Sequence, residues 1–423
     1  MRERQAFLDV AGREGNSFVV RMPYRRTRDA IVQALLLLAT AVAALSLSAL
    51  TFNIIDQSFG LVLLEERILR ESLAVGDRSL EELSQAELVE ILRAQLRPNL
   101  LQRLESERPL PQRSQAELYA LVMDRVVQPK IVRSWSLFES LFGRKAILQE
   151  LGEPLPPGQR LMWRSWLNPK FVTSPAGADP LRAGVRTAIL GSLWLVAIAM
   201  ALALPLGIGA AIYLEEYATP GRAMRLVELN IGNLAGIPSI IYGMLGLALF
   251  VRALQPLTSG ALFGMASPAP NGRTVISAGL TLGLLVLPII IINAQEAIRA
   301  VPSSLRLASY ALGATKWQTI WHHVLPSALP GILTGSILAL ARAIGETAPL
   351  IVVGAATFIT VDPKSPFSPF TALPVQIHQW TTRPQAEFRH LAAAAIIVLL
   401  LLLLVLNAAA VLLRARYSRR QLE

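Results

Sequence analysis

The feature that most constrains this chain is a series of apolar runs long enough to cross a lipid bilayer. The clearest run, "AAAAIIVLLLLLLVLNAAAVLL", covers residues 392–413 and contains no charged residue. About 20 such residues span the hydrocarbon core as a helix, which satisfies its own backbone hydrogen bonds. The chain is 53 % hydrophobic and 16 % charged, whereas a soluble domain is about 25 % charged. The sequence therefore predicts an all-α integral membrane protein.

The apolar runs divide the chain into segments. Six transmembrane helices are expected, at residues 31–52, 185–214, 229–251, 275–292, 332–358 and 391–413. Residues 1–30 then form an N-terminal segment, 53–184 a soluble insert between spans 1 and 2, 185–413 a membrane domain, and 414–423 a tail. The link between spans 4 and 5, residues 295–330, is too long for a simple turn.

Arginine residues indicate the orientation of these spans, because loops rich in Lys and Arg stay in the cytoplasm. Arginines precede the first span and follow the last, at positions 21, 25, 26, 28, 414, 416, 419 and 420. Both termini and the loop 295–330 are therefore expected to be cytoplasmic, and the insert extracytoplasmic. The basic residues that give a pI of about 10.5 flank spans, so they predict topology and no nucleic-acid partner.

The insert reads as helical. "SQAELVEIL" begins at Ser84 and "SQAELYALV" at Ser114, and each is a capping box in which the Ser and a Glu three residues later bond to each other's backbone. Two copies thirty residues apart fit either a duplicated helix-turn unit or two unrelated amphipathic helices. No catalytic constellation is visible in the insert, which could bind a partner or cover the outer mouth of the membrane domain.

The loop 295–330 has the pattern of a short helix with exposed apolar residues. Pro302 can open a helix, Ser303–Leu312 continues it, and Gly313 is placed to end it. Trp317, Ile320 and Trp321 then follow at helical spacing and are expected to share one face. Such a helix needs the membrane interface or a groove in another protein to cover its apolar residues.

This loop resembles the coupling loop of ABC-importer permeases, whose pattern is Glu-Ala-Ala, three residues, Gly, nine residues, Ile-x-Leu-Pro. The matching positions are Leu307, Ala308, Ser309, Gly313, His323, Leu325 and Pro326, with Trp317 inside the loop. Leu307 and His323 replace the family's Glu and Ile, so the contact made by that Glu is in doubt. In the family, the loop docks on a separate ATPase subunit. The chain has no Walker motif of its own.

The stretches "GIPSIIYGMLGLALF" and "ARAIGETAPL", together with this loop, resemble the PstA-type permeases of phosphate ABC importers. The resemblance covers residues 185–416 and implies the type I permease fold in a bacterial inner membrane. It implies phosphate as substrate and, as partners, a second permease subunit, two ATPase subunits and a periplasmic phosphate-binding protein. ATP and Mg would be bound by the ATPase, so no enzymatic activity, cofactor or metal site is expected in this chain. The insert lies outside the resemblance.

Two charges stand inside the fifth span, where a charge costs about 3 kcal/mol. Arg342 and Glu346 are four residues apart and therefore on one side of a helix, in line with Ala339, Gly335 and Gly331. Small residues allow another helix to approach. One interpretation is a substrate path in which Arg342 binds phosphate and Glu346 weakens the hold; the other is a structural ion pair. Gly279 and Gly283 form a second small-residue pair expected to pack helices.

Two alternative functions remain open from the sequence. The first is a permease for another oxyanion such as molybdate, sulfate or a phosphonate, because an arginine on the path suits any of them. The second is a membrane-anchored sensor or scaffold in which the insert is the working part.

Overall fold

The computed structural model describes residues 2–73, 78, 80–152, 154–264, 269, 271–356 and 358–419. The chain forms two compact units, residues 1–56 and 57–423. Helix α1 (Arg2–Ser58) makes up the first unit and ends just inside the second. Its part from Arg28 to Ser58 is apolar and long enough to cross a membrane, and the first predicted span lies within it.

The described part of the chain contains five helices with the length and composition of a membrane span. Besides Arg28–Ser58 they are Arg186–Tyr217, Val275–Arg299, Lys316–Gly345 and Ala386–Arg416. These correspond to α8 (Arg186–Ile212) with the π-turn η4 (Tyr213–Tyr217), to α12 (Val275–Arg299), to α14 (Lys316–Thr319), η7 (Ile320–Val324) and α15 (Leu325–Gly345), and to most of α18 (Glu387–Arg419). A multi-span helical membrane domain is thereby confirmed.

The third predicted span is not one straight helix. It consists of two helical halves, α9 (Arg222–Ala235) and α10 (Ser239–Gly246) with η5 (Leu247–Ala253). The helix axis bends by 102° between them. Pro238 stands at the bend, where a helix cannot continue because proline lacks the N–H and its ring clashes with the carbonyl four residues earlier. Counted as one broken span, the pair gives six spans.

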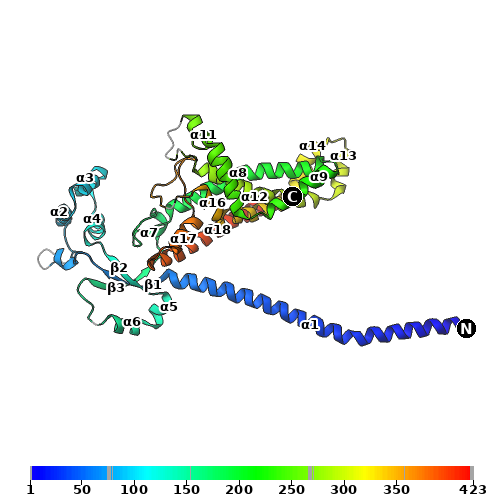
Figure 1. Cartoon of the computed structure of the whole chain (residues 1–423), viewed down its shortest axis with the longest axis horizontal. Coiled ribbons are helices and arrows are strands. Elements are labelled where there is room, and N and C mark those ends of the chain that lie inside the picture. Colours follow the sequence, from blue (N-terminus) through cyan, green and yellow to red (C-terminus); the bar gives the residue numbers. More distant parts are fainter. Residues whose placement is uncertain are drawn as a thin grey trace. The chain divides into compact units, whose positions relative to one another are not determined.

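Helix α12 is the centre of the membrane domain and packs against α8 and α15; Figure 1 shows α8 and α12 side by side. Glycines permit both contacts. A Cβ atom on Gly279 would lie 2.7 Å from the Ile198 Cβ atom of α8, and one on Gly283 would lie 2.9 Å from Leu202 Cδ2. On the other side, a Cβ atom on Gly331 would lie 2.8 Å from Ala297 Cβ, and one on Gly335 would lie still closer to Asn293 Cβ.

The insert contains a sheet that the sequence analysis did not predict. Strands β1 (Phe59–Glu65), β2 (Lys130–Ser134) and β3 (Gln159–Ser165) form an antiparallel sheet in the order β2-β1-β3. Leu61 pairs with Trp163, and a bulge interrupts the β1–β2 register between Leu63 and Leu64. The insert is therefore mixed, and the all-α description holds for the membrane domain alone.

The helical part of the insert has its own core. It comprises η1 (Arg70–Leu73), α2 (Gln85–Gln95), α3 (Pro98–Glu107), η2 (Leu110–Gln112), α4 (Gln115–Val122) and η3 (Met123–Val127). Both predicted capping boxes are confirmed, Ser84 with Glu87 and Ser114 with Glu117. The two copies pair with each other, because Gln85 donates to the Arg113 carbonyl and Gln115 to the Leu83 carbonyl, each at 2.8 Å.

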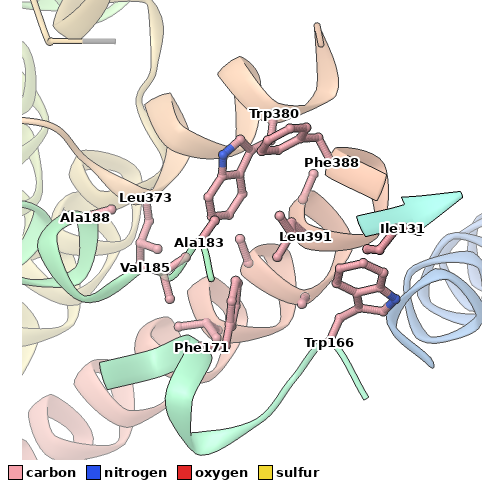
Figure 2. Packing of buried hydrophobic residues seen from close by; sticks show 14 of the residues in the cluster. Ile131, Trp166, Phe171, Ala183, Val185, Ala188, Leu373, Trp380, Phe388 and Leu391 are labelled. Atoms are coloured by element: carbon pink, nitrogen blue, oxygen red, sulfur yellow. The ribbon is translucent and has the colours of Figure 1, made fainter. Parts of the chain in front are cut away.

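The sheet packs against the membrane domain. Val62 and Ile131 of the strands share one buried cluster with Trp380 of α17 (Leu373–Thr381) and with Phe388 and Leu391 of α18; Figure 2 shows this cluster. Trp166 stacks on His390, with ring centroids 5.4 Å apart. The insert is thus built into the end of the bundle that carries α17.

Short elements complete the two ends of the domain. The insert also contains α5 (Leu137–Phe142), α6 (Arg144–Leu151) and α7 (Pro169–Thr173), and the loops of the membrane domain contain α11 (Gln255–Thr258), η6 (Ala261–Phe263), α13 (Ser303–Ala311) and α16 (Ala348–Val353). In Figure 1, α7 and α17 lie at one end of the bundle, and α9, α13 and α14 lie at the other.

Candidate functional site

The two charges singled out in the sequence lie where a span breaks. Helix α15 ends at Gly345, Glu346 is extended (φ −73°, ψ 124°), and α16 begins at Ala348. Pro349 explains the break, because a continued helix would place its ring against the carbonyl four residues earlier, which is that of Gly345. The fifth predicted span, 332–358, is therefore wrong in its extent: the helix runs from Lys316 to Gly345 and then breaks.

Arg342 and Glu346 are brought together across this helix end. The Arg342 Nε atom lies 3.3 Å from Glu346 Oε1, and the side chains are 39 % and 17 % exposed. Glu346 is the only acidic partner of Arg342 among the described residues. Below them on α15, Ala339 and Gly335 are buried, whereas Gly331 is exposed. Among the described residues the guanidinium makes no hydrogen bond besides that to Glu346, so it keeps donors that a ligand could use.

The bend at Pro238 lies against the break at Pro349. Gly243 of α10 permits this approach, because a Cβ atom there would lie 2.7 Å from Pro349 Cα. The Tyr242 hydroxyl donates to the Leu234 carbonyl at 2.8 Å, which is the carbonyl four residues before Pro238 and thus the one a proline cannot satisfy. Tyr242 shares one buried cluster with Ala339 and Ala343, which flank Arg342 along α15. Two irregular backbone segments and one arginine thus meet at one place.

Irregular backbone at membrane depth is tolerated only where it is buried in protein or lines a polar cavity. Discontinuous helices at such points commonly form the substrate sites of transport proteins. The structure therefore makes this meeting point the candidate site. Sequence reasoning identified its charges but not its shape, since Tyr242 and Pro349 carried no signal of their own.

The loop between α12 and α15 presents apolar side chains outward. Leu307 is 67 % and Leu312 90 % exposed, and Ala308 is also exposed. Ser309 is buried, with its hydroxyl 2.8 Å from that of Thr319. Gly313 has φ +80°, a left-handed conformation that glycine adopts without strain and that ends α13. Leu325 and Pro326 are half-buried at the start of α15.

The expectation that Trp317, Ile320 and Trp321 share one face is wrong. Trp317 and Trp321 stack on each other with centroids 5.5 Å apart and are both exposed. Ile320 is buried instead, because the helix widens into the π-turn η7 at this residue. In the same turn, His322 Nδ1 lies 3.0 Å from the Gln318 carbonyl, and no group of three potential metal ligands exists among the described residues.

Ion pairs tie this loop to the end of span 2. Arg306 of α13 donates through Nε and Nη2 to Glu216 Oε1, at 3.0 and 2.8 Å, and also to the carbonyls of Val301 and Ile298. Arg299 binds Glu215 at 2.6 Å nearby. Sequence analysis missed these pairs. The signal was two adjacent acids at 215 and 216 at the end of an apolar span, ninety residues before the arginine.

Comparison with known proteins decides the family. Residues 203–420 match the family described as the binding-protein-dependent transport system inner membrane component. The chain belongs to this family. Its fold class, its place in a membrane and its nature as a transport permease component follow from that membership, in agreement with the sequence analysis.

Members of this family with similar sequences include two curated proteins. The chain is 39 % identical over 203 residues to the phosphate transport system permease protein PstA 1 of Mycobacterium tuberculosis, covering 48 % of this chain and 60 % of that protein. It is 33 % identical over 230 residues to the probable ABC transporter permease protein YqgI of Bacillus subtilis, and the alignment covers 52 % of this chain and 73 % of that protein. The chain thus spans about six-tenths of the PstA relative. The resemblance to PstA-type permeases is confirmed.

One solved structure that also aligns with this chain is a transporter of methionine. It is the inward-facing MetNI methionine ABC transporter, with 20 % identity, a TM-score of 0.39, and coverage of 55 % of this chain and 94 % of that one.

Proposed function

We propose that this chain is the permease subunit of an ATP-driven importer that passes inorganic phosphate across the bacterial inner membrane. The family membership supports an importer, and the relatives named phosphate transport permeases support the substrate. The single observation that carries the proposal is the placement of Arg342. Its guanidinium is partly exposed beside two broken helices and has one carboxylate partner.

The chemistry of the pair fits an anion that must bind and leave. A guanidinium offers a planar set of donors that matches phosphate oxygens two at a time. A lone arginine at low dielectric would hold the anion too strongly, and conduction requires binding weak enough to release. Glu346 Oε1 lies 3.3 Å from Arg342 Nε. This carboxylate competes with phosphate for the guanidinium donors and so lowers the affinity of Arg342 for phosphate. The ion pair is then both a resting state and part of the path.

The partners proposed are a second permease subunit, two ATPase subunits that bind ATP and Mg, and a periplasmic phosphate-binding protein. The outward side chains of Leu307, Tyr310 and Leu312 give the ATPase an apolar surface to bind. The Arg306–Glu216 pair would carry a displacement of α13 to span 2. The arginines beside the spans place α13 on the cytoplasmic side of the membrane, because loops rich in Lys and Arg stay in the cytoplasm. Both termini are placed on the cytoplasmic side by the same reasoning.

Uptake of labelled phosphate tests the path. In cells that depend on this importer, Arg342→Ala should abolish uptake while the complex still assembles, and Arg342→Lys should retain part of it because the charge stays and the planar fork is lost. Arg97→Ala, an exposed arginine of the insert, is the matched control. Normal uptake by assembled Arg342→Ala would refute the path. Inhibition of this uptake by sulfate or molybdate at much lower concentrations than by unlabelled phosphate would assign the importer to another oxyanion.

Cross-linking tests the coupling surface separately. The chain contains no cysteine, so the variant Leu312→Cys has a single thiol, at position 312. This thiol should cross-link to the ATPase subunit, whereas Phe142→Cys, an exposed residue of the insert, should not. A Leu312 thiol that reacts only with a membrane-impermeant reagent added from outside intact cells would overturn the proposed orientation.

A further inference from the structure

A cavity of about 500 Å³ lies where the insert meets the membrane domain, at the end of the bundle opposite α13. It lies far along the chain from Arg342 and is built from other elements. Figure 2 shows four of its apolar walls, Trp166, Phe171, Ala183 and Leu391. The polar lining residues are Asp124, Arg164, Asn168, Lys170, Ser174 and Arg182.

Arg164 is the central cation of this cavity. Its guanidinium carbon lies 4.7 Å from the centre of the Trp166 ring, and Nη2 donates to the Leu181 carbonyl at 3.0 Å. Its buried Nε atom has no hydrogen-bond partner, and the described part of the chain contains no salt bridge to this arginine. Burial lowers the pKa of Arg164 from its usual range, because the charged form loses solvation.

Lys170 adds a second uncompensated charge. It is exposed at the cavity and has no side-chain partner among the described residues. The third cation, Arg182, is already neutralised, since it binds Asp124 and lies 3.4 Å from Asp179. Arg164 and Lys170 therefore make no salt bridge among the described residues, and Asp179, which is paired with Arg182, is the carboxylate that acts on Arg164 from outside salt-bridge distance. The Ser174 hydroxyl is a further lining donor.

Such an arrangement is costly unless something occupies it. Arg164 is half-buried, and a buried guanidinium nitrogen without a hydrogen bond is destabilising, so paired or anion-bound cations are the usual outcome. An aromatic ring stacked on one face of a guanidinium fixes its plane, and the N–H groups at the edge of that plane remain available to a ligand. The oxygens of a phosphate group, whether a free anion or a phosphodiester, can accept from an arginine edge, an ammonium and a hydroxyl together.

We propose that this cavity binds a phosphate group, held by Arg164, Lys170 and Ser174. The group comes either from free inorganic phosphate or from the headgroup of a phospholipid, because the same donors recognise both. The site is distinct from the proposed path at Arg342, and it stands or falls without reference to what the importer transports.

Hydrogen–deuterium exchange on the full chain in maltoside detergent tests the site locally. One arm adds inorganic phosphate, a second adds phosphatidylglycerol in mixed micelles, and a third adds potassium chloride at equal ionic strength. Peptides covering residues 160–174 should exchange more slowly in one of the first two arms, and peptides covering residues 85–122 should not change. Slower exchange of these peptides with inorganic phosphate identifies the ligand of the cavity as a free anion. Slower exchange with phosphatidylglycerol alone identifies it as a lipid headgroup.

Variants fix the protection to the named residues. Lys170→Gln should raise the ligand concentration for half-maximal protection about tenfold, the usual effect of losing a charge-assisted hydrogen bond. Arg164→Lys, which keeps the charge and loses the fork, should weaken it as well. Lys145→Gln, an exposed lysine on α6, is the control, and Arg342→Ala should retain full protection. Lys170 is exposed, so its variant is expected to fold. Absence of protection in both ligand arms, equal protection by chloride, or unchanged binding by Lys170→Gln would overturn the proposal.

Discussion

Arg306 holds Glu216 through two nitrogens, and the Glu216 side chain is only 6 % exposed. The pair joins α13, which exposes the apolar loop surface, to the turn that ends span 2. Buried ion pairs of this kind are costly to break, because the remaining charge is left without a partner. The neighbouring pair, Arg299 with Glu215, has an arginine that is 66 % exposed and should matter far less.

Glu216→Gln should therefore destabilise the chain, by about 3 kcal/mol. It leaves Arg306 charged, half-buried and without its carboxylate partner. The melting temperature of the purified protein measures the effect, with Arg299→Gln as the control, which should change it little. Equal shifts for the two variants would show that the Glu216 pair is no stronger than a surface contact.

Glu346→Gln should tighten the hold of Arg342 on phosphate. Removing the competing carboxylate frees donors on the guanidinium, so KM for uptake should fall about two- to fivefold, as expected for a partly exposed ion pair, with a lower maximal rate. Initial uptake rates across phosphate concentrations measure both quantities. Glu296→Gln, an exposed acid near the end of α12, serves for comparison. A raised KM would mean that Glu346 supports binding instead of opposing it.

Gly335→Ala should separate α15 from α12. The added Cβ atom would collide with Asn293, and overpacking of this kind costs about 1–3 kcal/mol. Gly209→Ala makes a matched control, since nothing lies within 4 Å of a Cβ atom there; it should be neutral or stabilise α8 slightly. Thermal unfolding in detergent compares the two. If both variants behave alike, the close contact at Gly335 is not required.

The first turn of α2 should lose protection in acid. Hydrogen bonds from Ser84 lower the pKa of the Glu87 carboxyl below its usual value. Because the folded pKa is depressed, ionised Glu87 stabilises the helix above the unfolded pKa, and this contribution is lost as pH falls through the folded pKa. Protection factors of the α2 amides at neutral and acidic pH measure it. Ser84→Ala should reduce the pH dependence; an unchanged profile would assign it to other groups.

Features that depend on neighbouring residues could be predicted from the sequence. The apolar runs at 275–292 and 391–413 became α12 and α18, because length and hydropathy alone decide what crosses a bilayer. The capping boxes at Ser84 and Ser114 formed as expected, since four consecutive residues contain all the groups that form their hydrogen bonds. Gly313 ended α13 for a similarly local reason.

Features that depend on distant partners were decided by the tertiary structure. Strand β1 contains a six-residue apolar run, residues 59–64, that could equally be helical, and its partners lie far along the chain at residues 130–134 and 159–165. The meeting of Gly243 with Pro349, and of Arg306 with Glu216, requires spans to be folded against each other. Local patterns thus established that the chain crosses the membrane and where its charges stand. Only packing between distant segments determined which charges meet and what surrounds them, because short-range spacing contains no information about such contacts.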